Sequence, residues 1–218
     1  MKITIILLFS LSLLGCGLSK DYISSVPTMG EKVRGPLKII HKPELAIHLK
    51  PNNDLLTNQF AYFLFPIFPI GWDTDDKLLV DEPNDTFKIQ LALFAYQDNL
   101  FLNFSDIRLN LQETTHKVAN VVQNPYAYNS ESQARSIGDK DIYCQASKNV
   151  IDLDFNTNQA LSNDGLWECY DLVFPVSAPY PEVHFQMEFS IKEGTTDKEI
   201  YYKIPFEHKE WGFADSFP

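Results

Sequence analysis

The chain has 218 residues, of which 44% are hydrophobic and 13% aromatic, and its 29 acidic against 18 basic side chains give a formal net charge of -11. A negative charge of this size repels nucleic acid and anionic lipid headgroups, so we expect no nucleic-acid partner. The apolar content suffices for a sizeable core, and the length favours one large domain over two.

The first fifteen residues have the pattern of a secretory signal peptide. Lys2 is followed by an apolar run from Ile3 to Leu14, and these are the charged and hydrophobic regions of such a signal. A membrane-spanning helix needs about 20 apolar residues, whereas this chain turns polar shortly after Cys16. The sequence therefore predicts an exported protein without a stable transmembrane span.

The signal ends in Leu13-Leu14-Gly15-Cys16. This junction resembles the lipobox of bacterial lipoproteins, over residues 1–16 only. The resemblance implies cleavage before Cys16, a diacylglycerol on its thiol, an acyl chain such as palmitate on its amine, and attachment to the membrane, which two or three chains make stable. Gly17, in place of the Asp that marks inner-membrane retention, implies the outer membrane in a Gram-negative cell. A buried cysteine in an N-terminal strand or helix is the alternative.

Residues 16–36 are expected to hold the lipidated cysteine and a flexible tether. They are rich in Gly, Pro and Ser and show no sustained periodicity, which is typical of a linker. Packing of part of this stretch as an edge strand remains open. Residues 37–218 are then a single domain.

From residue 37 onward, apolar and polar residues alternate between turn signals, as in half-buried strands. Four strands are clear and six are weaker, at 87–93, 107–111, 183–191 and 200–206, and at 45–49, 60–68, 99–104, 117–122, 149–155 and 166–176. We predict an all-β fold, a two-sheet antiparallel β-sandwich of immunoglobulin-like architecture with about nine or ten strands, and a β-barrel as the alternative. On this pattern His184 faces water.

Two cysteines, Cys144 and Cys169, remain after lipidation. Because an exported protein meets an oxidising environment, we expect a disulfide between them. On the chain-entropy model it would stabilise the fold by about 3 to 4 kcal/mol.

The stretch from Trp72 to Asp85, "WDTDDKLLVDEPND", is strongly acidic. Carboxylates suit a hard cation such as calcium, but the spacing does not fit an EF-hand. We expect a solvated, turn-rich loop over 73–85, and calcium binding stays open.

Residues 60–72, "FAYFLFPIFPIGW", form the most apolar stretch after the signal. Pro66 and Pro69 interrupt a strand ladder, so we expect a buried strand and then a bend at the edge of the sandwich. Alternatively, Phe65, Phe68 and Trp72 form an apolar patch for a partner, a ligand or the membrane.

Residues 123–141 show no strand alternation, and loops this long are uncommon inside a compact domain. Tyr126, Tyr128 and Arg135 are of the types enriched at binding hot spots. The loop is therefore a candidate binding surface, with a mobile solvent loop as the alternative.

The sequence contains no HExxH, no GxSxG and no phosphate-binding loop, so we expect no catalytic residues, no cofactor and no metal site. The leading hypothesis is a membrane-anchored envelope lipoprotein that acts as a non-catalytic binding or assembly module for an envelope protein partner. The alternatives are an inhibitor or immunity-type lipoprotein against a basic toxin or hydrolase, and a lipid- or sugar-handling envelope enzyme.

Overall fold

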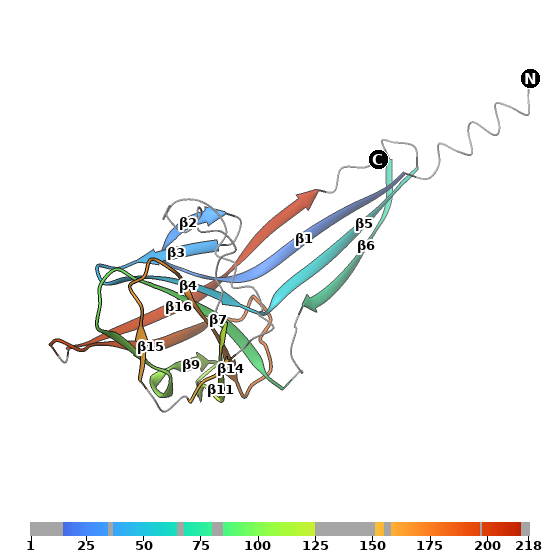
Figure 1. The fold of residues 1–218 in the computed structure, drawn as a ribbon. Coiled ribbons are helices and arrows are strands. Elements are labelled where there is room, and N and C mark those ends of the chain that lie inside the picture. The colour runs from blue at the N-terminus through green and yellow to red at the C-terminus, as the bar shows by residue number, and fades with distance from the viewer. Residues whose placement is uncertain are drawn as a thin grey trace, which may run out of the picture.

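The computed structural model describes residues 15–34, 37–64, 68–79, 85–124, 151–154, 158–196 and 198–214. These residues form two antiparallel β-sheets that pack as a β-sandwich, which confirms the predicted fold class (Figure 1). The one helical element among them is a short 3-10 turn, Phe104–Asp106. Within the described ranges, no helix has the length and apolar character needed to cross a membrane.

The larger sheet has nine strands, in the order β10-β9-β15-β16-β1-β5-β6, with β8 paired to β15 and β13 paired to β8. Their bounds are β1 Gly15–Pro27, β5 Asp54–Leu64, β6 Phe68–Leu79, β8 Leu100–Asn103, β9 Arg108–Leu111, β10 Thr114–Lys117, β13 Asn158–Leu161, β15 Phe185–Glu193 and β16 Lys198–Ala214.

The smaller sheet has seven strands, in the order β12-β11-β14-β7-β4-β3-β2. Their bounds are β2 Glu31–Arg34, β3 Leu37–His41, β4 Leu45–Pro51, β7 Phe87–Ala95, β11 Asn120–Asn124, β12 Ile151–Asp152 and β14 Glu168–Phe174.

The core lies between the sheets and is built from the alternating positions of their strands. On β7 the residues Phe87, Ile89 and Leu91 have no exposed surface. Phe185 and Phe206 of the larger sheet stack with ring centroids 4.5 Å apart, and Phe87 of the smaller sheet meets Phe185 edge-on at 5.6 Å. This cluster of three rings joins the two layers.

The four clear strands of the sequence correspond to β7, β9, β15 and β16, and His184 is exposed as predicted. The described residues nevertheless contain sixteen strands, more than the nine or ten expected. Several of the additional strands are only two to four residues long, which is too short for alternation to identify.

The predicted flexible tether over 16–36 is wrong for much of its length. Residues 15–27 form β1, an inner strand that pairs with β16 on one side and β5 on the other, and β2 pairs with β3. Alternation did not reveal β1 because two of its buried side chains, Ser24 and Ser25, are small and polar. The stretch assigned to a linker thus contributes a strand to each sheet, and β2, at the edge of the smaller sheet, agrees with the alternative of an edge strand.

Gly30 lies in the turn that carries the chain from β1 in one sheet to β2 in the other. Its φ is +105°, and an added Cβ would lie 2.7 Å from the carbonyl oxygen of Ile39. Only glycine adopts this backbone conformation without strain and leaves room for the neighbouring strand.

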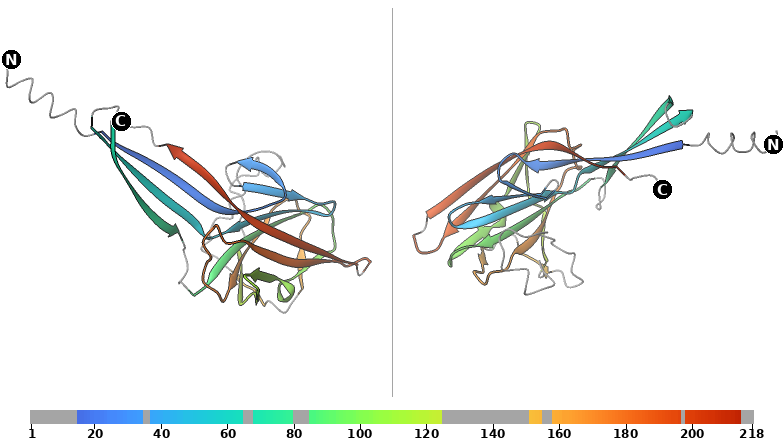
Figure 2. Two further views of the ribbon diagram at one scale, coloured as in Figure 1. Left: turned by 180° about the vertical axis from the view of Figure 1, so that it is seen from behind. Right: turned by 90° about the horizontal axis from the view of Figure 1, so that it is seen from above.

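Three strands, β1, β5 and β6, extend far beyond the sandwich, and the C-terminal part of β16 runs beside β1 (Figures 1 and 2). We call this projection the arm. The start of β1 and the end of β5 lie at the far end of the arm, whereas the end of β1 and the start of β5 enter the sandwich.

A buried polar cluster holds the arm where it joins the sandwich. Asn53 has no exposed surface, and its Nδ2 donates hydrogen bonds of 2.9 Å to Ser25 Oγ and to the carbonyl oxygen of Pro179. The hydroxyl of Ser25 donates in turn to the carbonyl oxygen of Pro181 at 3.4 Å. These bonds connect β1, the turn before β5 and the segment after β14, so we expect them to hold the arm at its root.

The strand pair β1 and β16 is also held by an aromatic contact. Tyr22 and Trp211 are directly paired, and their rings stack with centroids 4.7 Å apart. The Trp211 indole N–H donates to Ser24 Oγ at 2.8 Å. The arm is a continuation of the larger sheet through this strand pair.

His48 on β4 is buried with 1% of its surface exposed. Its Nδ1–H donates to the carbonyl oxygen of Lys38 at 3.0 Å, whereas its Nε2 has no hydrogen-bond partner among the described residues. Burial is the main cause that lowers the pKa of His48, the nearby Lys50 lowers it further, and the bond to Lys38 acts in the opposite direction. The imidazole is therefore neutral in the folded protein at neutral pH.

We expect this histidine to make stability fall on mild acidification. Because its pKa is lower in the folded state than the ordinary value of about 6.5, the unfolded chain takes up the proton first. The contribution of the neutral imidazole to the free energy of unfolding is complete above about pH 6.5. It is lost as the pH falls below that value, at up to about 1.4 kcal/mol per pH unit. Urea unfolding between pH 7 and pH 5.5 should show this slope, and His48→Gln should flatten it.

The matched control is His184→Gln, because that histidine is exposed. It should retain the wild-type slope. Equal slopes in wild type and His48→Gln would show that the pH dependence has another origin.

Candidate functional site

The structure brings three of the predicted site residues to one place, the far end of the arm. Cys16 lies near the start of β1, where it pairs with Tyr62 of β5, and Phe68 and Trp72 lie on β6, where they pair with Leu64 and Ala61. The other predicted site residues apart from Cys169 lie outside the described residues: Phe65, Tyr126, Tyr128, Arg135 and Cys144. Their predicted roles stay predictions.

We define the arm tip as residues 15–18 of β1, 60–64 of β5 and 68–72 of β6. None of these residues is charged. Directly paired residues of antiparallel strands share a face of the sheet, so Cys16, Tyr62 and Gly71 belong to one face. Cys16 and the described part of the apolar stretch 60–72 thus lie on neighbouring strands.

Residues 60–64 form a strand as predicted, the second part of β5, whereas residues 68–72 form a second strand, the start of β6, and not the expected bend. The two strands pair as neighbours in the arm. Pro69 falls where the pairing shifts register, between Tyr62 and Phe63, and β6 is the outermost strand of its sheet. An edge strand tolerates a proline at such an irregularity because no ladder bond is required there.

The acidic loop expected over 73–85 is also corrected. Residues 73–79 continue β6 and pair with β5, and residues 74–77 are exposed. The predicted exposure to solvent is therefore confirmed for these four residues, and the predicted loop is wrong for residues 73–79. Residues 80–84 lie outside the described part.

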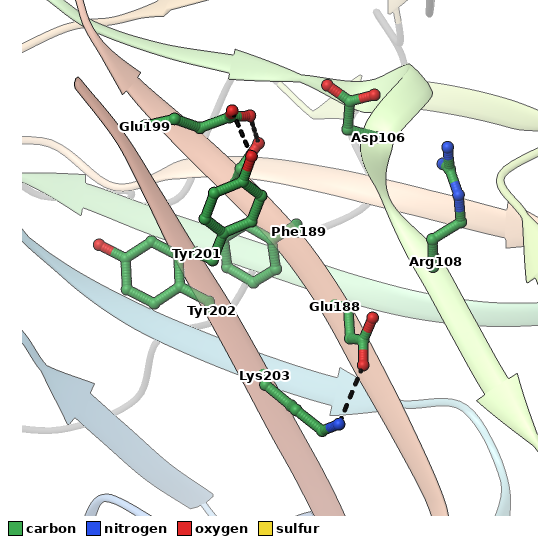
Figure 3. A pocket seen from close by; sticks show the side chains of 9 residues that line it. Asp106, Arg108, Glu188, Phe189, Glu199, Tyr201, Tyr202 and Lys203 are labelled. Carbon is green, nitrogen blue, oxygen red and sulfur yellow. Dashed lines mark hydrogen bonds and ion pairs between the residues drawn. The ribbon is translucent and has the colours of Figure 1, made fainter.

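A second candidate site is a depression of about 550 Å³ on the solvent face of the larger sheet (Figure 3). Its lining comes from β9, β15 and β16 and from the 3-10 turn, and it includes Phe189 and Tyr202, two core residues whose rings stack. The lining residues are Asp106, Arg108, Glu188, Phe189, Ser190, Glu199, Tyr201, Tyr202 and Lys203.

Most polar groups of this depression are paired with one another. Lys203 Nζ lies 3.4 Å from a carboxylate oxygen of Glu188. Glu199 accepts hydrogen bonds from the hydroxyls of Ser190, at 2.6 Å, and of Tyr201. Tyr201 is nevertheless 75% exposed, so its ring is available to a ligand.

The hydrogen bonds from Ser190 and Tyr201 lower the pKa of Glu199, and the bond to Glu199 raises the pKa of Tyr201. Both shifts move these groups away from neutral pH, where an efficient general acid or base must titrate. The carboxylate stays ionised and the phenol stays protonated. The depression therefore suits contact with a polar ligand or a protein surface better than proton transfer by these two residues.

Sequence reasoning did not single out this depression. Glu188 and Ser190 occupy the polar positions of a strand whose apolar positions were recognised, so the alternation did place them on the solvent face. Asp106 and Arg108 come from a segment about 80 residues earlier, and no local pattern connects them with β15.

Cys169 lies on β14 with no exposed surface. Since Cys144 lies outside the described residues, the Cys144–Cys169 disulfide stays a prediction. Counting thiols in denatured, unreduced protein tests it.

The described residues contain no cluster of three or more His, Cys, Asp or Glu side chains that could hold a metal ion. The histidines are dispersed, for instance His41 beside Tyr96 and His116 beside Thr114. Comparisons with protein-family models, curated proteins and solved structures found no match to this chain.

Proposed function

We propose that the chain is an envelope lipoprotein, anchored to the membrane by acyl chains on Cys16, whose β-sandwich is a non-catalytic binding or assembly module. The observation that carries the proposal is the position of Cys16 at the far end of the arm. Among residues 21–27 of β1, Ser24 is the first that is buried, and it lies eight residues after Cys16, which is roughly 26 Å at 3.3 Å per residue. Acyl chains at Cys16 therefore leave the sandwich unobstructed.

The depression around Tyr201 is the best candidate for the contact with a partner. It lies on the first half of β16, whereas the arm is formed by the second half of that strand. Gly212 of β16 pairs with Asp21 of β1 in the arm. Tyr201 and Gly212 are eleven residues apart along β16, or roughly 36 Å. The depression is thus remote from the anchoring end and remains open to a protein or polar ligand in the envelope.

Metabolic labelling with a fatty-acid analogue tests the anchor. We expect the wild type to incorporate the label and to require detergent for extraction, because its acyl chains remain in the bilayer. Cys16→Ser should lose all label, since the acceptor thiol is gone. The control Cys144→Ser should retain it.

Unchanged labelling of Cys16→Ser would contradict the proposal. Release of the wild type as a soluble protein without detergent would do the same.

A further inference from the structure

We propose that the arm tip itself inserts into the outer few ångströms of a lipid bilayer, beside the acylated Cys16. The inference takes the membrane from the proposed function. It adds a second contact with that membrane, made by the protein itself. It is argued from strand register and sequence pattern.

The arm tip is apolar on both faces of the sheet. Along β5, Phe60, Tyr62 and Leu64 belong to one face, and Ala61 and Phe63 to the other. An antiparallel sheet in water commonly has one apolar and one polar face. A strand that is apolar on both needs apolar surroundings on both sides, and the sandwich lies at the other end of the arm (Figure 2).

The apolar part of the arm has the length of one leaflet at most. Residues 60–64 span roughly 13 Å, less than half of the roughly 30 Å hydrocarbon thickness. The outer edge of β6 also carries backbone groups that hydrocarbon would leave without hydrogen bonds. We therefore place the tip at the boundary between headgroups and acyl chains.

Two aromatic residues mark the depth. Ala61 pairs with Trp72 and Tyr62 pairs with Gly71, so Tyr62 and Trp72 lie within one residue of the same level along the arm. Tyr and Trp are the residues enriched at membrane interfaces. Immediately beyond Trp72 the chain becomes acidic, from Asp73 to Asp76, which limits further entry and disfavours anionic lipid.

The cysteine identifies the membrane as the occupant. Cys16 pairs with Tyr62, so acyl chains on its thiol and amine would leave β1 at the level of the aromatic pair. Anchoring by these chains keeps the apolar strands at the lipid surface. A protein partner would have to bind in the same confined space.

Tryptophan fluorescence tests the depth directly. The mature chain from residue 16, with Cys16→Ser so that no acyl chain contributes, is mixed with phosphatidylcholine vesicles containing brominated acyl chains. In the variant Trp167→Phe, Trp211→Phe, the remaining Trp72 should shift its emission to shorter wavelength and be quenched. The matched variant Trp72→Phe, Trp167→Phe keeps only Trp211. Trp211 pairs with Tyr22, which lies six residues after Cys16, or roughly 20 Å closer to the sandwich than the tip. Its fluorescence should not be quenched.

A charge-insertion pair provides a second measurement. Leu64→Asp with Phe68→Asp places two carboxylates at paired positions of the tip, and we expect vesicle partitioning to fall by about tenfold or more, because charged groups are costly in an apolar environment. The matched control, Leu166→Asp with Tyr180→Asp, changes two exposed apolar residues of the sandwich outside the depression and should partition like the wild type. Replacing half of the phosphatidylcholine by phosphatidylglycerol should weaken binding of the unsubstituted tip.

The outcomes separate this inference from the proposed function. If Cys16 is labelled in cells but Trp72 is not quenched in vesicles, the anchor stands and insertion of the tip is refuted. If Trp72 is quenched but Cys16 takes no label, the tip inserts and the lipoprotein proposal fails. If the charged tip variant does not fold, the tryptophan variants still decide.

Discussion

Phe185→Ala should lower the free energy of unfolding by about 3 to 5 kcal/mol, the range for truncating a buried phenylalanine. The ring is 4% exposed, stacks on Phe206 within its own sheet and meets Phe87 of the opposite sheet edge-on. Its removal takes apolar surface out of the core and leaves a cavity between the layers. Urea unfolding followed by circular dichroism measures the loss as a lower midpoint at an unchanged slope.

The control for this experiment is Tyr201→Ala, which removes an aromatic ring of similar size from an exposed position of the neighbouring strand. It should change the free energy of unfolding by less than about 0.5 kcal/mol, as is usual on the surface. A similar loss in both variants would show that the three rings do not join the sheets.

Asn53→Ala should lower the free energy of unfolding by about 2 to 3 kcal/mol. The change removes both hydrogen bonds from Nδ2 and leaves the buried Ser25 hydroxyl and the Pro179 carbonyl without this donor. The Oδ1 atom has no partner among the described residues, so its removal offsets part of the loss. Because these bonds hold the root of the arm, hydrogen exchange of β1 from Tyr22 to Val26 should accelerate as well.

Asn110→Ala is the matched control. Asn110 Oδ1 accepts a hydrogen bond from Thr115 Oγ1 at 2.7 Å, but this bond lies at the exposed surface. We expect a change of less than about 0.5 kcal/mol and no effect on β1. If Asn53→Ala exchanges β1 at the wild-type rate, the cluster does not hold the arm.

The sandwich could be predicted because its clearest strands have one face in the core and one in water. Ile89 and Leu91 on β7, or Met187 and Phe189 on β15, repeat with the period of a strand and are buried where that period places them. β1 escaped detection because Ser24 and Ser25 are buried without being apolar. Asn53 gives no signal at all, since its importance depends on the Ser25 hydroxyl and the Pro179 carbonyl, which are 28 and 126 residues away.

The two parts of the arm tip were recognised separately, and their proximity was not. The resemblance of residues 1–16 to a lipobox signal drew attention to Cys16, and composition drew attention to Phe68 and Trp72 as a candidate surface. Cys16 and its partner Tyr62 are 46 residues apart, and the β1–β5 register that joins them is a property of the tertiary fold. A pattern within one strand carries no information about which strand lies beside it.

The inner position of β1 determines how the protein responds to mechanical load. Force between an anchored Cys16 and a partner bound to the sandwich would act along the axis of β1, which is paired with β16 from Ser19 to Pro27 and with β5 from Cys16 to Ile23. Both ladders would then be loaded in shear, so that many backbone hydrogen bonds share the force and none is opened alone at an end. A flexible linker would stretch under the same pull, whereas attachment at Cys16 would transmit the force to the body of the protein at nearly constant length.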